Sequence, residues 1–302
     1  MKDLKISKEE KSLNFNNLKE QFIRYIDVSD KTIETYSGNL RQFIKYMQEN
    51  NIKNPTREDI IVYREYLKEN YELNTVNGMM ISIRQFFKFL EYKGIYKNIT
   101  DNVKGVKIEN YHKREYLTLE QCKNVLNGAK NIRERVLFTI TFTCGLRANE
   151  VANIRLEDFT LKGGKHCLYV LGKDRDGKQD YVVVPEETFE LIKEYVKEYN
   201  IQDYLFVSES NNNKGGKVAT CTLRRIINKM YERVGIVGKE YVFHSLRHSF
   251  ATLSLQNGID IREVSKGLRH KNIQTTEVYA HDLDKINNRC SNTISNMLLG
   301  GI

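Results

Sequence analysis

The sequence predicts a mainly α protein of two domains with one small β-hairpin or sheet. Its 302 residues are enough for two separate cores. Apolar residues recur at helical spacing through the first hundred residues, whereas only one later region reads as paired strands. An aperiodic stretch of mixed charge, from about residue 98 to residue 115, separates the two parts. We therefore expect one domain over residues 1–108 and a second over residues 109–302.

The first domain is expected to be a compact bundle of four short amphipathic helices. Ser29 or Asp30 would cap the second helix, and Thr56 with Asp59 forms a capping box for the third. Gly94 stands where the fourth helix would end. The apolar stripes step by three and four residues along Leu18–Ile26, Ile33–Met47, Ile60–Leu67 and Val76–Leu90.

The second domain is expected to mix helices with the β region. A capping box at residues 118–121 opens its first helix, and an apolar helix over Arg133–Phe142 follows and ends at Gly145. Two strand-like runs, Cys167–Leu171 and Tyr181–Val184, flank a polar turn with two glycines. The remainder of the chain reads as helical.

Composition narrows the classes of function. The net charge of +9 and the pI near 9.1 favour an anionic partner such as nucleic acid. No run approaches ~18 apolar residues, so we expect no membrane span, and the N-terminus lacks the apolar core of a signal peptide. The five cysteines are widely spaced, without a C-x-x-C pair, which predicts a reducing cytoplasm and neither a disulfide framework nor a zinc site.

Six polar residues of the second domain form the pattern that bears most on function. Two arginines, a lysine and two imidazoles suit the dispersed negative charge of a phosphoryl-transfer transition state, and a phenol could supply a covalent step. They are Arg147, Lys173, His244, Arg247, His270 and Tyr279, in the strings C-G-L-R-A-N-E, L-G-K-D-R, F-H-S-L-R-H and L-R-H-K-N-I-Q-T-T-E-V-Y.

Each of these residues also has an ordinary interpretation when taken alone. Arg147 precedes Glu150 by three residues, so the two could simply form an ion pair, and Lys173 shares its turn with a second lysine. His244 and His248 have the i,i+4 spacing of some zinc sites, but the glutamate of H-E-x-x-H and a third ligand are absent, so we expect no metal.

Tyr279 is likewise one of 18 tyrosines. A free phenol has a pKa near 10, so attack at neutral pH needs cationic neighbours or a proton acceptor. The functional interpretation therefore depends on the whole set.

In order and spacing, the four strings resemble the motif of the tyrosine recombinases, the phage-integrase family that breaks and rejoins DNA. The resemblance covers nearly the whole chain. The segment L-K-E-Q-F-I-R-Y-I and the helix after it resemble the SAM-like core-binding domain of Xer-type recombinases and many integrases. From about Tyr116 onward the chain looks like the catalytic domain of the family.

The resemblance implies a role for each residue at the scissile phosphate. Arg147 and Arg247 would clamp its non-bridging oxygens, His244 would contact the same phosphate, and Glu150 matches an acidic residue that would orient Arg147.

The remaining three residues would move protons and form the covalent bond. Lys173 would protonate the departing 5′ oxygen, and His270 would hydrogen-bond the phosphate or support proton transfer. Tyr279 would attack phosphorus and give a 3′-phosphotyrosine. Two positions depart from the family pattern, because Asp174 and Arg269 stand where glycine is common.

The resemblance also implies partners. We expect double-stranded DNA as substrate, no cofactor and no ATP, and a homotetramer on paired sites. The chain contains no G-x-x-x-x-G-K-[ST] loop, which agrees with energy being kept in the protein–DNA bond. The apolar residues after Tyr279 could dock on their own domain or, as often in the family, on a neighbouring protomer; we favour the neighbour.

Three other functions compete with a recombinase. A non-catalytic DNA-binding protein on the same fold would not need the full set of cations and nucleophile. A type IB topoisomerase shares the chemistry, but the small helical first domain favours the recombinase. A metal-dependent nuclease would need a carboxylate cluster that the sequence lacks.

Overall fold

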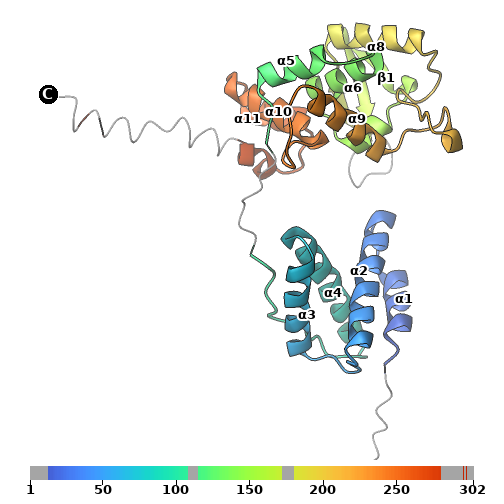
Figure 1. Cartoon of the computed structure of the whole chain (residues 1–302), viewed down its shortest axis with the longest axis vertical. Coiled ribbons are helices and arrows are strands. Elements are labelled where there is room, and N and C mark those ends of the chain that lie inside the picture. Colours follow the sequence, from blue (N-terminus) through green and yellow to red (C-terminus); the bar gives the residue numbers. More distant parts are fainter. Residues whose placement is uncertain (1–12, 108–114, 172–179, 280–294, 296, 298–302) are drawn as a thin grey trace, which may run out of the picture. The chain divides into compact units, whose positions relative to one another are not determined.

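The computed structural model describes residues 13–107, 115–171 and 180–279, together with residues 295 and 297. The chain divides into two compact units, residues 1–111 and 112–302. The described residues are mainly helical and contain one small sheet (Figure 1). None of their helices has the length and apolar character needed to cross a membrane.

The first unit contains the four predicted helices, whose apolar stripes meet in one core. Helix α2 contacts both α1 and α4, and α3 packs on α4. The largest side chains of this core, including Phe22, Phe43, Tyr63, Phe86 and Phe87, are almost completely buried. The helices are α1 (Phe15–Tyr25), α2 (Asp30–Glu49), α3 (Arg57–Asn70) and α4 (Leu73–Tyr92).

Local signals set the ends of these helices. Thr56 and Asp59 form the predicted capping box at the start of α3. Ser29 stands at the N-cap of α2, but its side chain makes no capping hydrogen bond. Gly94 follows α4 with a φ of 65°, in the left-handed region that glycine adopts without steric cost.

The first part of the predicted linker is packed on this unit. Val103 is buried, and the guanidinium of Arg84 donates to its carbonyl oxygen at 3.0 Å. The backbone of Val106 exchanges two hydrogen bonds with the Asn77 amide, at 2.8 and 2.9 Å. The sequence does not reveal this docking, because both partners lie on α4, 19 and 29 residues before the residues they bond.

The second unit is built around α6, which contacts α5, α8, α9 and α10. Because neighbours surround it, α6 is apolar on most faces and shows no strong amphipathic stripe. The predicted capping box opens α5, where Thr118 and Gln121 bond reciprocally. The helices are α5 (Leu119–Asn127), α6 (Ile132–Thr143), α7 (Ala148–Ala152), α8 (Glu186–Glu198), α9 (Thr220–Arg233), α10 (Phe243–Gln256) and α11 (Ile261–Gly267), and residues 274–279 are also helical.

The sheet has three antiparallel strands in the order β1-β2-β3. The two predicted strands correspond to β2 (Lys165–Val170) and β3 (Asp180–Val183), paired with Tyr169 opposite Tyr181. The sequence analysis missed β1 (Phe159–Lys162). The signal was present, because Gly163 and Gly164 both have positive φ and form the two-residue turn that joins β1 to β2.

Two helix ends of the second unit have the same geometry. After α6, the N–H groups of Gly145 and Leu146 donate to the carbonyls of Phe142 and Thr141. After α11, the N–H groups of Arg269 and His270 donate to the carbonyls of Lys266 and Ser265. Both are Schellman motifs, in which the first residue beyond the cap takes a left-handed backbone. That residue is Gly145 in one motif, with φ 57°, and Arg269 in the other, also with φ 57°.

The described cysteines are all free thiols. Cys122, Cys144 and Cys167 are buried in the second unit, whereas Cys221 lies exposed on α9.

Candidate active site

Arg147 lies at the N-cap of α7, directly after the α6 Schellman motif. Its backbone N–H donates to Glu150 at 2.8 Å, and its guanidinium donates to the other carboxylate oxygen at 2.7 Å. The Glu150 side chain is only 4% exposed, whereas the side chain of Arg147 is 31% exposed. The carboxylate therefore fixes Arg147 from the buried side and leaves part of the guanidinium accessible.

Arg247 projects from α10 and is fully buried. Its guanidinium donates to the carbonyl of Gly145 at 2.6 Å and to the carbonyl of Leu268. These carbonyls stand at the C-terminal ends of α6 and α11, where the helix dipole favours a positive charge. Arg247 thus connects two helix ends, while its Nε–H has no hydrogen-bond partner among the described residues.

Arg269 adds a third guanidinium, with a side chain 5% exposed. It donates to Glu150 at 2.7 Å and to the carbonyl of Gly267 at 2.8 Å. The carbonyls of Cys144 and Gly145 each lie 3.5 Å from a guanidinium nitrogen. We refer to Arg147, Arg247 and Arg269 as the arginine cluster.

Charges within the arginine cluster shift the pKa values of Glu150 and Arg247. Burial raises the pKa of Glu150, but the charge of Arg269 and the donors of Arg147 outweigh it, so the pKa lies below its usual value. Burial and then the charges of Arg147 and Arg269 lower the pKa of Arg247 to about 9. Arg247 therefore stays charged at neutral pH.

His270 follows Arg269 at the end of the same Schellman motif. Its Nδ1 lies 2.8 Å from the hydroxyl of Thr276, which is completely buried. Burial first, and then the three charges of the arginine cluster, lower the pKa of His270 to about 4. The imidazole is therefore neutral at pH 7 and can accept or donate a proton, depending on its tautomer.

Three rings form a row beside the arginine cluster. The centroids of His244 and His248, both on α10, lie 5.2 Å apart, and His248 meets the ring of Tyr279 edge-on at 4.9 Å. Tyr279 is 9% exposed and packs in a small apolar cluster with Ala251, Val264 and Leu268. It also interacts electrostatically with Arg247.

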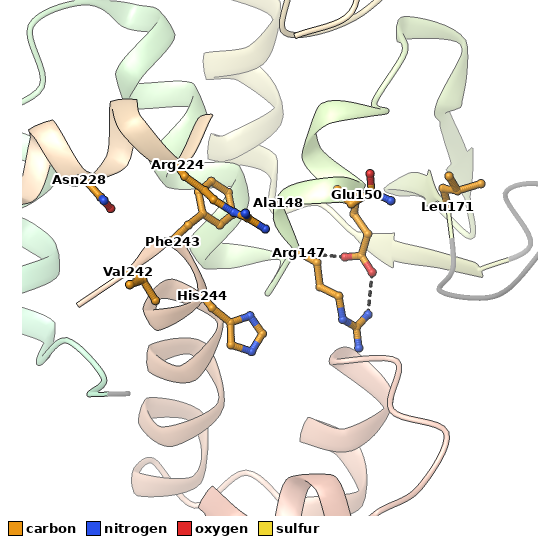
Figure 2. A pocket seen from close by; sticks show the side chains of 10 residues that line it. Arg147, Ala148, Glu150, Leu171, Arg224, Asn228, Val242, Phe243 and His244 are labelled. Atoms are coloured by element: carbon orange, nitrogen blue, oxygen red, sulfur yellow. Dashed lines mark hydrogen bonds and ion pairs between the residues drawn. The ribbon is translucent and has the colours of Figure 1, made fainter. Parts of the chain in front are cut away.

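A cavity of about 570 Å³ opens at this place. Figure 2 shows Arg147 and His244 projecting into the same space, with the dashed ion pair from Arg147 to Glu150 behind it. Arg224 and Asn228 of α9 form another wall. The walls of the cavity are therefore rich in hydrogen-bond donors, as a phosphate site requires.

Five of the six predicted residues come together in this region, together with Glu150. Arg147 and His244 line the cavity, and Arg247, His270 and Tyr279 lie in the buried structure around the arginine cluster. Lys173 lies outside the described residues. Among the described residues, no group of three or more histidine, cysteine, aspartate or glutamate side chains is placed to hold a metal ion.

Sequence reasoning missed three contributors to the site. His248 was considered only as a metal ligand, although its spacing on the helix of His244 already put the two side by side. Arg224 had no local signal, because α9 carries several exposed cations. Arg269 was noted as a departure, but its contact with Glu150 was not foreseen.

Comparisons with known proteins found matches to both units of the chain. The model of the phage integrase family matches residues 115–285, and that of the phage integrase N-terminal SAM-like domain matches residues 20–94. A tyrosine recombinase of Pseudothermotoga lettingae is 32% identical over 267 residues, which cover 85% of this chain and 90% of the relative. Tyrosine recombinase XerC of Halalkalibacterium halodurans is 30% identical over 275 residues, covering 84% of this chain and 87% of the relative.

Two solved structures share the fold. The XerH site-specific recombinase, bound to a palindromic difH substrate after cleavage, matches with a TM-score of 0.74 and 24% identity over 93% of this chain and 84% of its own. A lambda integrase tetramer bound to a Holliday junction matches with a TM-score of 0.71 and 15% identity over 89% of this chain and 78% of its own.

Proposed function

The chain belongs to the phage integrase family and is a site-specific tyrosine recombinase; from this premise we propose that Tyr279 is its nucleophile. The phenolic oxygen attacks the scissile phosphorus of DNA as it loses its proton. The bond from phosphorus to the 5′ oxygen breaks, and that oxygen is protonated. The products are a 3′-phosphotyrosine and a free 5′-hydroxyl, and attack by a different 5′-hydroxyl rejoins the strands.

The observation that carries this proposal is the position of Tyr279 against His248 and within electrostatic reach of Arg247. Its ring meets His248, and the phenol interacts electrostatically with the buried guanidinium of Arg247. A nearby positive charge favours the phenolate that must attack. Tyr231, by contrast, is almost fully buried, and burial raises its pKa well above the usual value, which makes it a poor nucleophile.

Arg147 and Arg247 bind the non-bridging oxygens in this proposal. Arg147 reaches the cavity with a guanidinium already oriented by Glu150, so little reorganisation is needed on binding. The Nε–H of Arg247 is buried and has no hydrogen-bond partner among the described residues, and we assign it to a phosphoryl oxygen of the bound substrate. The negative charge on the non-bridging oxygens of the transition state is then stabilised by fixed hydrogen-bond donors in a partly buried site.

The other groups assist proton transfer and binding. His244 lines the cavity and contacts the same phosphate. Neutral His270, bonded to Thr276, hydrogen-bonds the phosphate or moves a proton. We assign protonation of the 5′ oxygen to Lys173, on the strength of its position in the sequence between β2 and β3.

We further propose that the substrate is double-stranded DNA and that four protomers act on paired sites. The net charge of +9 supports an anionic partner. XerH is described with its difH substrate, and lambda integrase as a tetramer on a Holliday junction. The first unit serves as the core-binding domain and the second as the catalytic domain, in agreement with the two family models.

Trapping on a nicked suicide substrate tests the nucleophile. Candidate sites are inverted half-sites in the DNA that flanks the coding region. The protein should become attached to a DNA 3′ end without added magnesium, and affinity should fall steeply as salt rises. Tyr279→Phe should bind the site but trap nothing, whereas the matched control Tyr241→Phe should trap like the unmodified protein. Continued trapping by Tyr279→Phe would assign the nucleophile elsewhere.

A further inference from the structure

Arg269 occupies a backbone position that favours glycine. It is the first residue beyond the cap of α11, with a φ of 57°, and its N–H closes the Schellman motif on Lys266. A side chain at such a position is strained by contact with its own backbone. Asn200, after α8, adopts a comparable φ of 48°, but asparagine tolerates this region better than arginine. Arginine at residue 269 therefore calls for a compensating interaction.

The side chain of Arg269 supplies that interaction at the active site. Its guanidinium donates to Glu150 at 2.7 Å. The same carboxylate orients Arg147 from the buried side of the cavity, and Figure 2 shows this pair of Arg147 and Glu150. The guanidinium of Arg269 also lies 3.5 Å from the carbonyl of Gly145, which accepts the hydrogen bond of Arg247 at 2.6 Å. Arg269 thus contacts one acceptor of each proposed phosphate-binding arginine.

Arg269 also adds a positive charge to the site. Glu150 alone could largely neutralise Arg147, leaving Arg247 as the one uncompensated guanidinium. With Arg269 present, three arginines share one carboxylate, so the centre formed by these four residues carries a net charge of +2. The terminal nitrogens of Arg269 already donate to Glu150 and to the carbonyl of Gly267, so we give Arg269 an indirect role. Its influence must pass through Glu150 and through the electrostatic field of the buried site.

We propose that Arg269 is a positioning residue for strand cleavage, which aligns Arg147 through Glu150 and adds a buried positive charge beside Arg247. The proposal rests on the proposed function, because it assigns Arg147 and Arg247 to the scissile phosphate. It distinguishes this chain from the family pattern that it resembles, in which glycine is common at this position. The alternative is that Arg269 only forms the end of α11 and has no influence on cleavage.

Arg269→Gly separates the two possibilities, since glycine suits the left-handed backbone and removes only the side chain. Single-turnover cleavage at saturating protein should slow at least about 10-fold, less than the ~10²–10³-fold loss of a donor that touches the transition state. Site affinity and melting temperature should be retained. Arg269→Lys, which keeps the charge and can still reach Glu150, should recover part of the rate.

Two controls complete the test. Asn200→Gly makes the same backbone change after α8, away from the arginine cluster, and should cleave like the unmodified protein. In a double-mutant cycle, Glu150→Gln combined with Arg269→Gly should lose less than the product of the two single losses, because both act through one ion pair.

Two results would overturn the proposal: cleavage by Arg269→Gly at the unmodified rate, or a rate loss that follows a lowered melting temperature and disappears on cooling. Failure of the proposed function would look different. The unmodified protein would then not be trapped, or Tyr279→Phe would still be trapped, whatever the rate of the Arg269 variants.

Discussion

Arg247→Ala should destabilise the fold as well as stop cleavage, because Arg247 satisfies the carbonyls of Gly145 and Leu268 at the ends of two helices. Each buried carbonyl left without a donor costs about 1–3 kcal/mol. Relief of repulsion from the other two arginines offsets part of this, so we expect a net loss of about 2–3 kcal/mol. For a unit of this size, the melting temperature should fall by roughly 4–12 °C.

Arg147→Ala is the matched variant. Its side chain is 31% exposed, and Glu150 keeps the ion pair with Arg269 and the backbone N–H of residue 147. Its loss should cost less than about 1 kcal/mol, as for other partly exposed ion pairs. Both variants should cleave about 10²–10³-fold more slowly, while site affinity changes much less because many other phosphate contacts persist.

Scanning calorimetry and single-turnover cleavage of the suicide substrate measure the two effects separately. If Arg247→Ala melts like Arg147→Ala, the carbonyl contacts contribute no stability and the reasoning from burial is wrong. If either folded variant loses binding and cleavage in equal measure, the arginine only anchors DNA.

Three further predictions follow from other parts of the molecule. The pKa of His270 is about 4 in the folded protein, below its ordinary value of 6.5, so the unfolded chain binds more protons between these two pH values. The free energy of unfolding should therefore have its full value above about pH 6.5 and decrease toward pH 4. In denaturant titrations, His270→Gln should flatten this decrease. Gly145 has a φ of 57°, and a Cβ added there would lie only 3.0 Å from the nearest side-chain atom, whereas Gly163 has a φ of 54° and open space around it. Gly163→Ala should therefore cost only about 1–2 kcal/mol of backbone strain, and Gly145→Ala should lose clearly more stability. Deleting the residues after about Asp284 should preserve binding to a single site and abolish cooperative binding and recombination; unfolding of the truncated protein would instead mean that the segment docks on its own domain.

The helical part of the fold could be predicted because its signals are local. The four helices of the first unit follow from apolar spacing, and the capping boxes at Thr56 and Thr118 are confirmed to the residue. Strand β1 was missed because four residues carry too little periodicity, although the Gly163–Gly164 turn marked its end. The docking of residues 103–106 could not be predicted, because it depends on partners 19 and 29 residues away.

The same holds for the site, where contacts between residues close in sequence could be predicted and contacts between distant residues could not. The pairing of Arg147 with Glu150 follows from a spacing of three residues at a helix start. The partners of Arg247 do not, since its carbonyl acceptors lie 102 and 21 residues away in sequence. The Arg269–Glu150 pair spans 119 residues and exists only because two Schellman motifs bring their ends together.

The exposed thiol of Cys221 makes α9 a natural place for a spectroscopic reporter. It is the one exposed cysteine among the described residues, and it lies one helical turn before Arg224, which lines the cavity. Replacing Cys290, which lies outside those residues, with serine would leave Cys221 as the accessible thiol for a maleimide dye. Fluorescence resonance energy transfer between labelled protomers could then be used to follow assembly on DNA in real time. This labelling alters no residue of the proposed cleavage chemistry.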